Sequence, residues 1–205
     1  MRGVDKYEQI YYTLCINTNA EVPMAQSTQT TKHMRPASAV RSMAHIAVAA
    51  ALLAVCSWLT IPFTVPFTMQ TFAVFLTLLL LGGRDGTIAI GVYILLGAVG
   101  VPVFSGFTGG ISRIIGATGG YIAGFLATGG VYWLAERPGK RWRIPSLVAG
   151  LAVCYTLGTL WFCYVTGTGF AAALMLCVVP FLLPDAVKLV LAALLGARLR
   201  PILDR

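Results

Sequence analysis

Six strongly apolar segments follow one another along most of this chain, with short connections between them. Their approximate limits are 39–61, 70–81, 86–103, 114–135, 145–164 and 184–199. A helix needs about 20 residues to cross the ~30 Å hydrocarbon core of a bilayer, and most of the segments approach that length. Only 11% of the residues are charged, whereas soluble domains carry about 25%. The sequence therefore predicts an all-α membrane protein with six transmembrane helices.

The first 36 residues differ in composition from the rest of the chain. They hold polar runs such as AQSTQTTKHM and three of the seven acidic residues. A segment of this kind buries too little apolar surface to offset the conformational entropy that folding removes. We therefore expect a disordered cytoplasmic tail over residues 1–36 and a six-helix transmembrane domain over residues 37–205.

Basic residues fall almost entirely in alternate connections. One set of connections holds eight of them, and the other set holds only Arg113. The eight are Arg84, Arg137, Lys140, Arg141, Arg143, Arg198, Arg200 and Arg205. Short cytoplasmic loops of membrane proteins are enriched in Lys and Arg. We therefore expect a multi-pass protein of the plasma membrane with both termini in the cytoplasm. The formal charge of +8 then reflects topology, and no nucleic-acid partner is expected.

A pair of opposite charges, Asp185 and Lys188, lies within the apolar run VVPFLLPDAVKLVLAALLG at residues 178–196. Three residues apart on a helix, the two side chains project from one face. Each charge inside a bilayer costs at least ~2.5 kcal/mol on insertion scales, so such residues indicate a functional site. Residues 170–183 are too short to span the membrane, so we expect Pro184 to begin the last helix. Both charges would then lie near its outer end and face a ligand cavity. A purely structural ion pair is the alternative.

Residues 101–121, VPVFSGFTGGISRIIGATGGY, place six glycines in an outward connection. Non-helical backbone at membrane depth is tolerated where it lines a cavity or is buried in protein, so this loop is a candidate second wall of the site. Close helix packing is the alternative, and Gly120 and Gly124 have the spacing for it.

Three further polar residues lie on the outer side. Arg113 is expected to attract an anionic ligand, to reach lipid headgroups, or to pair with a carboxylate. Thr68 and Gln70 open the second segment and offer hydrogen bonds to a bound molecule or to the backbone.

The first segment carries Ala47, Ala50, Ala51 and Ala54, which form two overlapping pairs of small residues four apart. In lipid such a face lets another helix approach closely, from a partner subunit or from the same chain. The sequence contains no phosphate-binding loop, zinc motif or catalytic triad. We therefore expect no enzymatic activity, metal or cofactor, and any ATP hydrolysis that powers the protein would take place in another polypeptide.

Three stretches of the chain resemble one family of membrane proteins. They are TMQTFAVFLTLLLLGGRDG from residue 68, GVPVFSGFTGGISRIIGATGGYIAGF from residue 100, and PFLLPDAVK from residue 180. Taken in this order, they make residues 40–199 similar to the BioY family, the biotin-binding S components of energy-coupling-factor (ECF) transporters. The resemblance implies a six-helix protein that captures biotin from outside with high affinity. It also implies docking on a transmembrane coupling protein and two cytoplasmic ATPases.

Carried onto this sequence, the resemblance assigns roles to three groups of residues. Asp185 and Lys188, which match the DxxK spacing, would hold the ligand. The glycine-rich loop, with Gly109 and Gly110, would form another part of the site together with Tyr121. The alanine face of the first helix, residues Ala47, Ala50, Ala51 and Ala54, would meet the coupling protein.

The chemistry of biotin fits this assignment. Its ureido ring has two N–H donors and a carbonyl, and its side chain ends in a carboxylate. Ionised Asp185 can accept from the donors, while Lys188 can donate to the carbonyl or to the carboxylate. Phe104, Phe107 and Tyr121 are expected to pack on the apolar ring and chain. Lys188→Ala should weaken biotin binding by well over about tenfold, because a buried charge is left without its partner.

Three other functions stay open at this point. The chain could be an S component for a different vitamin, or a structural subunit whose ion pair locks helix packing. It could also be an intramembrane enzyme that uses Asp185 and Lys188 as acid and base. The enzyme is disfavoured because the helices offer few further polar groups that could converge on the pair.

Overall fold

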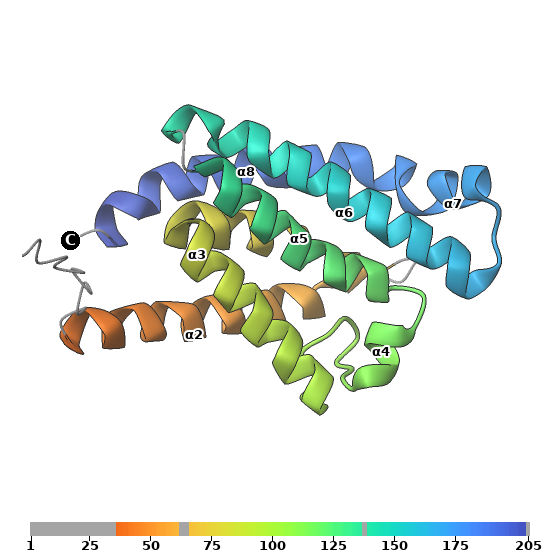
Figure 1. Cartoon of the computed structure of the whole chain (residues 1–205), viewed down its shortest axis with the longest axis horizontal. Helices are drawn as coiled ribbons and strands as arrows, with labels where there is room; N and C mark the ends of the chain where they lie inside the picture. The colour runs from red at the N-terminus through yellow and green to blue at the C-terminus, as the bar shows by residue number, and fades with distance from the viewer. Residues whose placement is uncertain (1–35, 62–65, 137–138, 204–205) are drawn as a thin grey trace, which may run out of the picture. The chain divides into compact units, whose positions relative to one another are not determined.

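The computed structural model describes residues 36–61, 66–136 and 139–203. Within these ranges the helices are α2 (Pro36–Trp58), α3 (Gln70–Val99), α4 (Ile111–Ile115), α5 (Gly119–Glu136), α6 (Arg143–Thr166), α7 (Phe170–Cys177) and α8 (Val179–Leu203) (Figure 1). A short 3-10 helix, η1 (Lys140–Trp142), precedes α6, and strands β1 (Thr60–Ile61) and β2 (Phe67–Thr68) pair antiparallel. The predicted tail over residues 1–36 lies outside the described residues, apart from Pro36 at the start of α2.

Four stretches of the described chain are long and apolar enough to cross a membrane. They are Ala39–Trp58, Gln70–Val99, Arg143–Thr166 and Phe170–Pro201. The remaining long helix, α5, has 18 residues and packs along α6. The prediction of an all-α membrane protein is confirmed.

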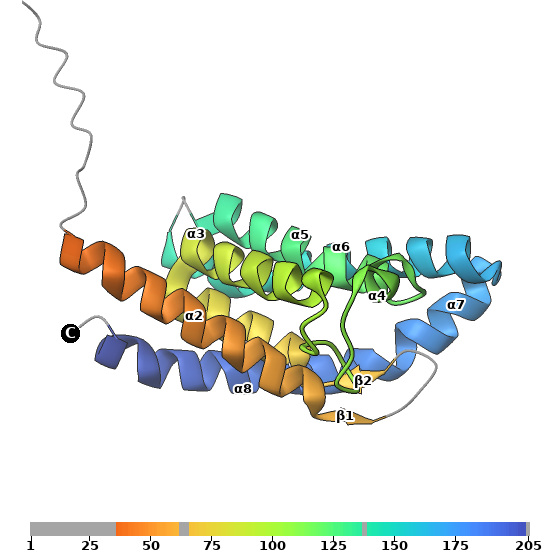
Figure 2. The same cartoon turned by 90° about the horizontal axis from the view of Figure 1, so that it is seen from below.

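Gly82 folds α3 back on itself. Its φ of 82° and ψ of 178° lie outside the helical region, and glycine adopts such a φ readily because it has no Cβ. A Cβ on Gly86 would lie 3.2 Å from Cα of Leu78, although eight residues of unbroken helix span about 12 Å. The two halves, 70–81 and 83–99, therefore run antiparallel and pack against each other (Figure 2). They correspond to the second and third segments of the sequence, joined without a loop.

Side chains from other helices cap the two helix ends at this turn. The backbone N–H of Gly83 donates to Oε2 of Glu136 at 2.6 Å, and Arg200 donates to the carbonyl oxygen of Leu79 at 3.1 Å. Backbone groups at helix ends have no partner within the helix and need one elsewhere. Arg143 also contacts Glu136 at 3.4 Å, so α5, α6 and α8 all meet the turn in α3.

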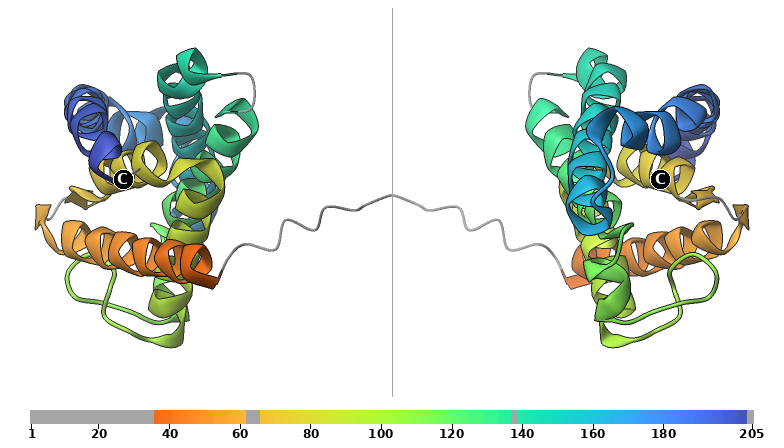
Figure 3. Two further views of the ribbon diagram at one scale, coloured as in Figure 1. Left: turned by 90° about the vertical axis from the view of Figure 1, so that its left-hand side faces the viewer. Right: turned by 90° about the vertical axis from the view of Figure 1, so that its right-hand side faces the viewer.

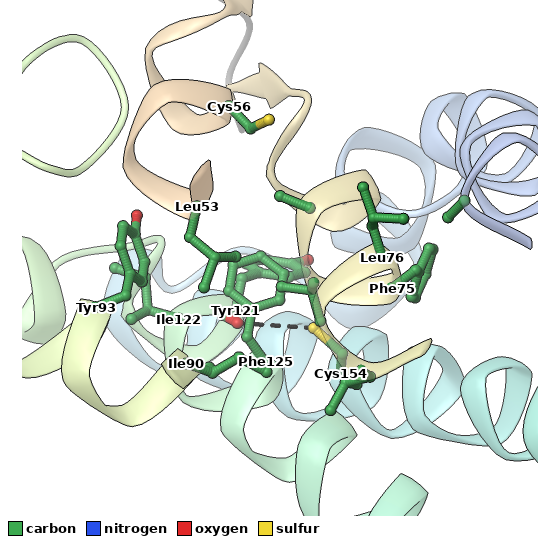
Figure 4. Close-up of a cluster of buried hydrophobic side chains, with 14 of the residues drawn as sticks. Leu53, Cys56, Phe75, Leu76, Ile90, Tyr93, Tyr121, Ile122, Phe125 and Cys154 are labelled. Carbon is green, nitrogen blue, oxygen red and sulfur yellow. Dashed lines mark hydrogen bonds between the residues drawn. The ribbon is translucent and has the colours of Figure 1, made fainter. Parts of the chain in front are cut away.

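The first half of α3 lies at the centre of the helices (Figure 3). Residues 73–79 are buried without interruption. Figure 4 shows part of the surrounding core, in which Leu53 of α2, Ile90 and Tyr93 of α3, and Phe125 of α5 belong to one buried cluster. This central half-helix carries its first turn, residues 70–73, to one end of the bundle, where the site described below is found.

Glycines bring α5 and α6 into close contact. A Cβ on Gly120 would lie 2.3 Å from Cβ of Trp161, and one on Gly124 would lie 2.9 Å from Cα of Cys154. In lipid, helices associate through close packing, and small residues allow it. The spacing of Gly120 and Gly124 therefore serves helix packing, which was the alternative considered for these two glycines.

Helix α8, the last span, begins before Pro184, the residue at which the sequence predicts its start. Only Val178 separates α7 from α8, and α8 starts at Val179. Pro184 lies inside α8, where it removes one backbone hydrogen bond, to the carbonyl of Pro180. The prediction that Pro184 begins the helix is therefore wrong, and Asp185 lies in the second turn of α8.

The two ends of the bundle carry different elements. Figures 1 and 2 show α4 and α7 at one end, and the start of α2 with the end of α8 at the other. The second end also holds the turn at Gly82 with Glu136, Arg143 and Arg200.

Candidate ligand-binding site

A cavity lies among α3, α5, α6 and α8, at the end of the bundle that carries α4. Its empty space of about 750 Å³ includes open solvent, so its concave shape and mostly apolar lining, and not this volume, are what resemble a small-molecule site. Its apolar walls include Phe104, Tyr121, Phe125, Leu151 and Phe181. Its charged lining residues within the described chain are Arg113, Asp185 and Lys188. An apolar space with a few charged groups suits a small molecule that has polar ends and an apolar body.

Asp185 is buried, with 2% of its surface exposed, and side chains from three helices bind its carboxylate. Oδ1 accepts from Nζ of Lys188 and from Oγ1 of Thr71, each at 2.8 Å. Oδ2 accepts from the hydroxyl of Tyr155 at 2.6 Å. A buried carboxylate is tolerated when it is paired and hydrogen-bonded in this way.

Lys188 lies on the same inward face of α8, three residues after Asp185. Besides Asp185, its Nζ donates to the carbonyl oxygen of Thr68 at 2.7 Å and to Oγ1 of Thr71 at 3.0 Å. The ring of Phe67 lies 4.1 Å away, measured from Nζ to the ring centroid. All three N–H donors of Lys188 are therefore paired within the protein, and both Asp185 and Lys188 border the cavity.

Seven of the residues singled out in the sequence line this cavity: Thr68, Gln70, Phe104, Arg113, Tyr121, Asp185 and Lys188. Gln70 donates from Nε2 to the hydroxyl of Tyr93 at 2.8 Å, and the hydroxyl of Tyr121 lies 3.2 Å from Oγ1 of Thr159. Figure 4 shows Tyr121 beside Cys154, whose thiol donates to the backbone carbonyl of Tyr121 at 3.7 Å. These bonds hold the aromatic and amide groups in place around the empty space.

Phe107, Gly109 and Gly110 are not among the residues that line the cavity. Phe107 is 64% exposed and stacks on Trp58 of α2, with ring centroids 4.9 Å apart. A Cβ on Gly109 would lie 2.4 Å from the carbonyl oxygen of Val101, and the N–H of Gly110 donates to the carbonyl of Gly97 at 2.7 Å. The glycines thus let the loop pack tightly against itself and against the end of α3. Of residues 101–110, Phe104 and Ser105 reach the cavity.

The four alanines of α2 divide into two pairs. Ala47 and Ala51 are exposed. Ala50 and Ala54 are 4% and 7% exposed and belong to the core, because this side of α2 packs on α3. The prediction that Ala50 and Ala54 meet a partner protein is therefore wrong for this conformation, and only Ala47 and Ala51 remain available.

Sequence reasoning missed Thr71 and Tyr155, the two hydroxyl groups that bind Asp185. Thr71 directly follows Gln70 in the first turn of α3, so its position could have indicated a role. Tyr155 is 30 residues from Asp185, and the other tyrosine of the same helix, Tyr164, is 83% exposed. The presence of a tyrosine in α6 therefore does not by itself indicate that its side chain reaches the site.

Known proteins resemble the chain over most of its length. Residues 25–205 match the sequence model of the BioY family. The biotin transporter BioY of Thermotoga maritima is 39% identical over 164 residues, which cover 78% of this chain and 96% of that protein. The probable biotin transporter BioY of Pyrococcus horikoshii is 43% identical over 136 residues, covering 66% of this chain and 81% of that protein.

One solved structure shares the fold. A crystal structure of the S-component for biotin from an ECF-type ABC transporter matches with a TM-score of 0.75, covering 82% of this chain and 95% of that chain, at 23% identity. This likeness concerns the fold, whereas the family match and the curated relatives identify the family. The chain belongs to the BioY family.

Proposed function

We propose that this protein is the substrate-binding membrane subunit of an ECF-type transporter and that its substrate is biotin. The observation that carries the proposal is the position of Asp185, whose buried carboxylate borders an apolar cavity. Its Oδ2 accepts one hydrogen bond, from Tyr155, and has room for a further donor. The relatives named as biotin transporters support the choice of substrate. Energy for transport would come from partner proteins.

Biotin would lie with its ureido ring toward Asp185 and its carboxylate toward Arg113. An ionised carboxylate accepts hydrogen bonds and repels another carboxylate, so Asp185 suits the ureido N–H groups. The hydroxyl of Tyr155, 2.6 Å from Oδ2, can accept the second N–H. Arg113 lines the cavity from α4, and its side chain makes no hydrogen bond or ion pair within the described chain. Phe104 and Tyr121 would contact the apolar part between these two ends.

The cavity would open to the outside of the cell. It lies at the end of the bundle opposite Arg143, Arg200 and the turn at Gly82. Basic residues near the membrane favour the cytoplasmic side. The start of α2 and the end of α8 lie at the basic end (Figure 1), so both would face the cytoplasm of a cell whose plasma membrane the protein spans.

Ala47 and Ala51, exposed on α2, would face the transmembrane coupling protein that two cytoplasmic ATPases drive. Small side chains let the partner helix approach closely. Ala51→Trp should block ATP-driven biotin uptake into cells and leave biotin binding unchanged. Val148→Trp, on an exposed position of α6, adds the same side chain elsewhere and should leave uptake intact. Equal loss of uptake in the two variants would contradict the coupling role.

Equilibrium binding of labelled biotin to the purified protein in detergent tests the proposed substrate. We expect saturable binding that unlabelled biotin displaces and that excess thiamine or riboflavin does not. Asp185→Asn should weaken binding by about tenfold or more, because a charged acceptor is lost. Asp85→Asn, at the opposite end of the bundle, should bind as the unmodified protein does.

Each contrary result has a distinct meaning. Displacement by thiamine or riboflavin would indicate an S component for another vitamin. A stable, monodisperse sample that binds no biotin would refute the substrate and favour a structural subunit.

A further inference from the structure

One side of α6 is exposed and apolar along most of its length. We call it the exposed face of α6, and its residues from 144 to 160 are Ile144, Pro145, Val148, Ala149, Ala152, Val153, Thr156, Leu157 and Leu160. Thr156 is the only one of these with a polar side chain, and its Oγ1 donates to the carbonyl oxygen of Ala152 at 2.8 Å. That hydroxyl is satisfied within the helix, so no side chain on this face needs water.

Aromatic residues stand where the exposed face ends. At the start of α6, Trp142 is 44% exposed, and the guanidinium carbon of the exposed Arg141 lies 5.8 Å from its ring centroid. At the other end, Trp161 is half-buried and donates from Nε1 to the carbonyl oxygen of Gly116 at 2.9 Å. Its ring centroid lies 6.0 Å from that of Tyr164, which is 83% exposed. Trp and Tyr are enriched at the two membrane–water interfaces, so both ends of the face have the composition of such an interface.

The distance between the two tryptophans matches the thickness of a bilayer. Trp142 is the N-cap residue of α6, and Trp161 lies 19 residues further along the same helix. At 1.5 Å per residue this separation is about 28 Å, and the hydrocarbon core of a bilayer measures ~30 Å. The charge at the basic end is also complementary, because Arg141 beside Trp142 would meet the anionic headgroups of the cytoplasmic leaflet. Contact with another protein would require neither this length nor these ends.

We infer that lipid acyl chains cover the exposed face of α6 and that the hydrocarbon core of the bilayer ends at Trp142 and at Trp161. Tyr155 and Leu151 line the cavity from the same helix. They lie six and ten residues before Trp161, which places them about 9 and 15 Å below its level. The cavity therefore reaches from one membrane surface to about the middle of the bilayer. This depth does not depend on which ligand the protein binds.

Nitroxide labels along α6 test the position of the bilayer. Single cysteines are introduced into the full-length chain with its five native cysteines replaced by alanine, and the labelled protein is reconstituted into vesicles of phosphatidylcholine and phosphatidylglycerol. Collisions with O2, which concentrates at the bilayer centre, are compared with collisions with a nickel chelate that stays in water. The ratio should be highest at Ala152→Cys, the exposed position nearest the midpoint between the tryptophans, and should fall equally toward both ends. The labelled positions, all exposed, are Ile144, Val148, Ala152, Thr156 and Leu160.

Two results of this experiment would overturn the inference. A maximum displaced from Ala152 by a helical turn or more, about four residues, would place the boundaries away from the tryptophans. Few collisions with either reagent, together with slowed nitroxide motion, would mean that a second copy or another protein covers the face. Arg141→Cys, beyond the boundary, is the control and should collide mainly with the nickel chelate.

A second measurement retains the native cysteines and so does not depend on folding of the cysteine-free chain. Ala152→Trp and Leu160→Trp each add one indole to the exposed face, and the fluorescence of the unmodified protein, with its four tryptophans, is subtracted. Lipids brominated deep in the acyl chain should quench the added fluorescence of Ala152→Trp more than lipids brominated near the headgroup do. For Leu160→Trp the order should be reversed. The same order in both variants would contradict the proposed depth.

Discussion

Arg113 and Lys188 both bring a positive charge to the cavity, but their surroundings differ. Lys188 is 4% exposed and bonded to three protein oxygens. Arg113 is exposed, and its side chain makes no hydrogen bond or ion pair within the described chain. A guanidinium group carries five N–H donors in a fork that matches a carboxylate. Arg113 is therefore the cavity residue best suited to the carboxylate of biotin.

Arg113→Gln should weaken biotin binding by about tenfold, because it removes a charge-assisted hydrogen bond at a partly solvated position. The same variant should bind biotin amide within about twofold of the unmodified protein, since that ligand has no carboxylate to lose. Arg84→Gln, an exposed arginine beside the turn in α3, serves as the control and should bind both ligands normally. Titration with both ligands checks this, and an equal loss for the two would place the carboxylate elsewhere.

The sequence identifies site residues that are unusual in their surroundings, such as charges in an apolar segment. It does not identify site residues that become part of the site only through tertiary contacts. Asp185 and Lys188 could be found because charges are costly in an apolar run. Tyr155 could not, because nothing local links it to Asp185. The glycine run signalled non-helical backbone, but the loop turns Phe104 inward and Phe107 outward onto Trp58. That direction depends on contacts far apart in the chain.

At the scale of helices, the lengths of the apolar segments predicted the membrane spans. The glycines and prolines between them predicted less well where one helix ends and the next begins. GGRD at residues 82–85 reads as a loop, yet Gly82 alone interrupts α3, because Glu136 and Arg200 satisfy the backbone groups at the break. Pro184 reads as a helix start, yet α8 continues through it. In both cases the outcome depends on how the freed backbone groups are satisfied, which the local sequence does not show.

Gly124→Ala should destabilise the protein by about 1–3 kcal/mol, a typical cost of overpacking a tight interface. The added Cβ would lie 2.9 Å from Cα of Cys154 and so force α5 and α6 apart. Gly130→Ala lies on the same helix with nothing within 4 Å of the added Cβ and should be neutral or slightly stabilising. Thermal unfolding in detergent, followed by light scattering, compares the two variants. Equal midpoints would mean that α5 and α6 tolerate separation.

For the whole molecule, the distribution of charge predicts which end meets each side of the membrane. In a variant with all five native cysteines replaced by alanine, Ile111→Cys on α4 and Arg141→Cys on η1 place single thiols at exposed positions at opposite ends. A membrane-impermeant maleimide added to intact cells should label position 111 and should label position 141 only after permeabilisation. Biotin binding by the cysteine-free protein verifies its fold, and the reverse labelling pattern would invert the proposed orientation.

The turn at Gly82 also determines whether the chain crosses the bundle an even or an odd number of times. With the turn, the chain from α2 to α8 traverses its bundle an even number of times, so that both described ends lie at one end (Figure 1). If a residue in place of Gly82 kept α3 straight, its 30 residues would form a single helix of about 45 Å. The chain would then cross the bundle an odd number of times. Every later connection, including the one with Arg141 and Arg143, would then be delivered to the opposite compartment from the start of α2. Gly82 therefore determines at which end of the bundle, relative to the start of α2, each later connection lies.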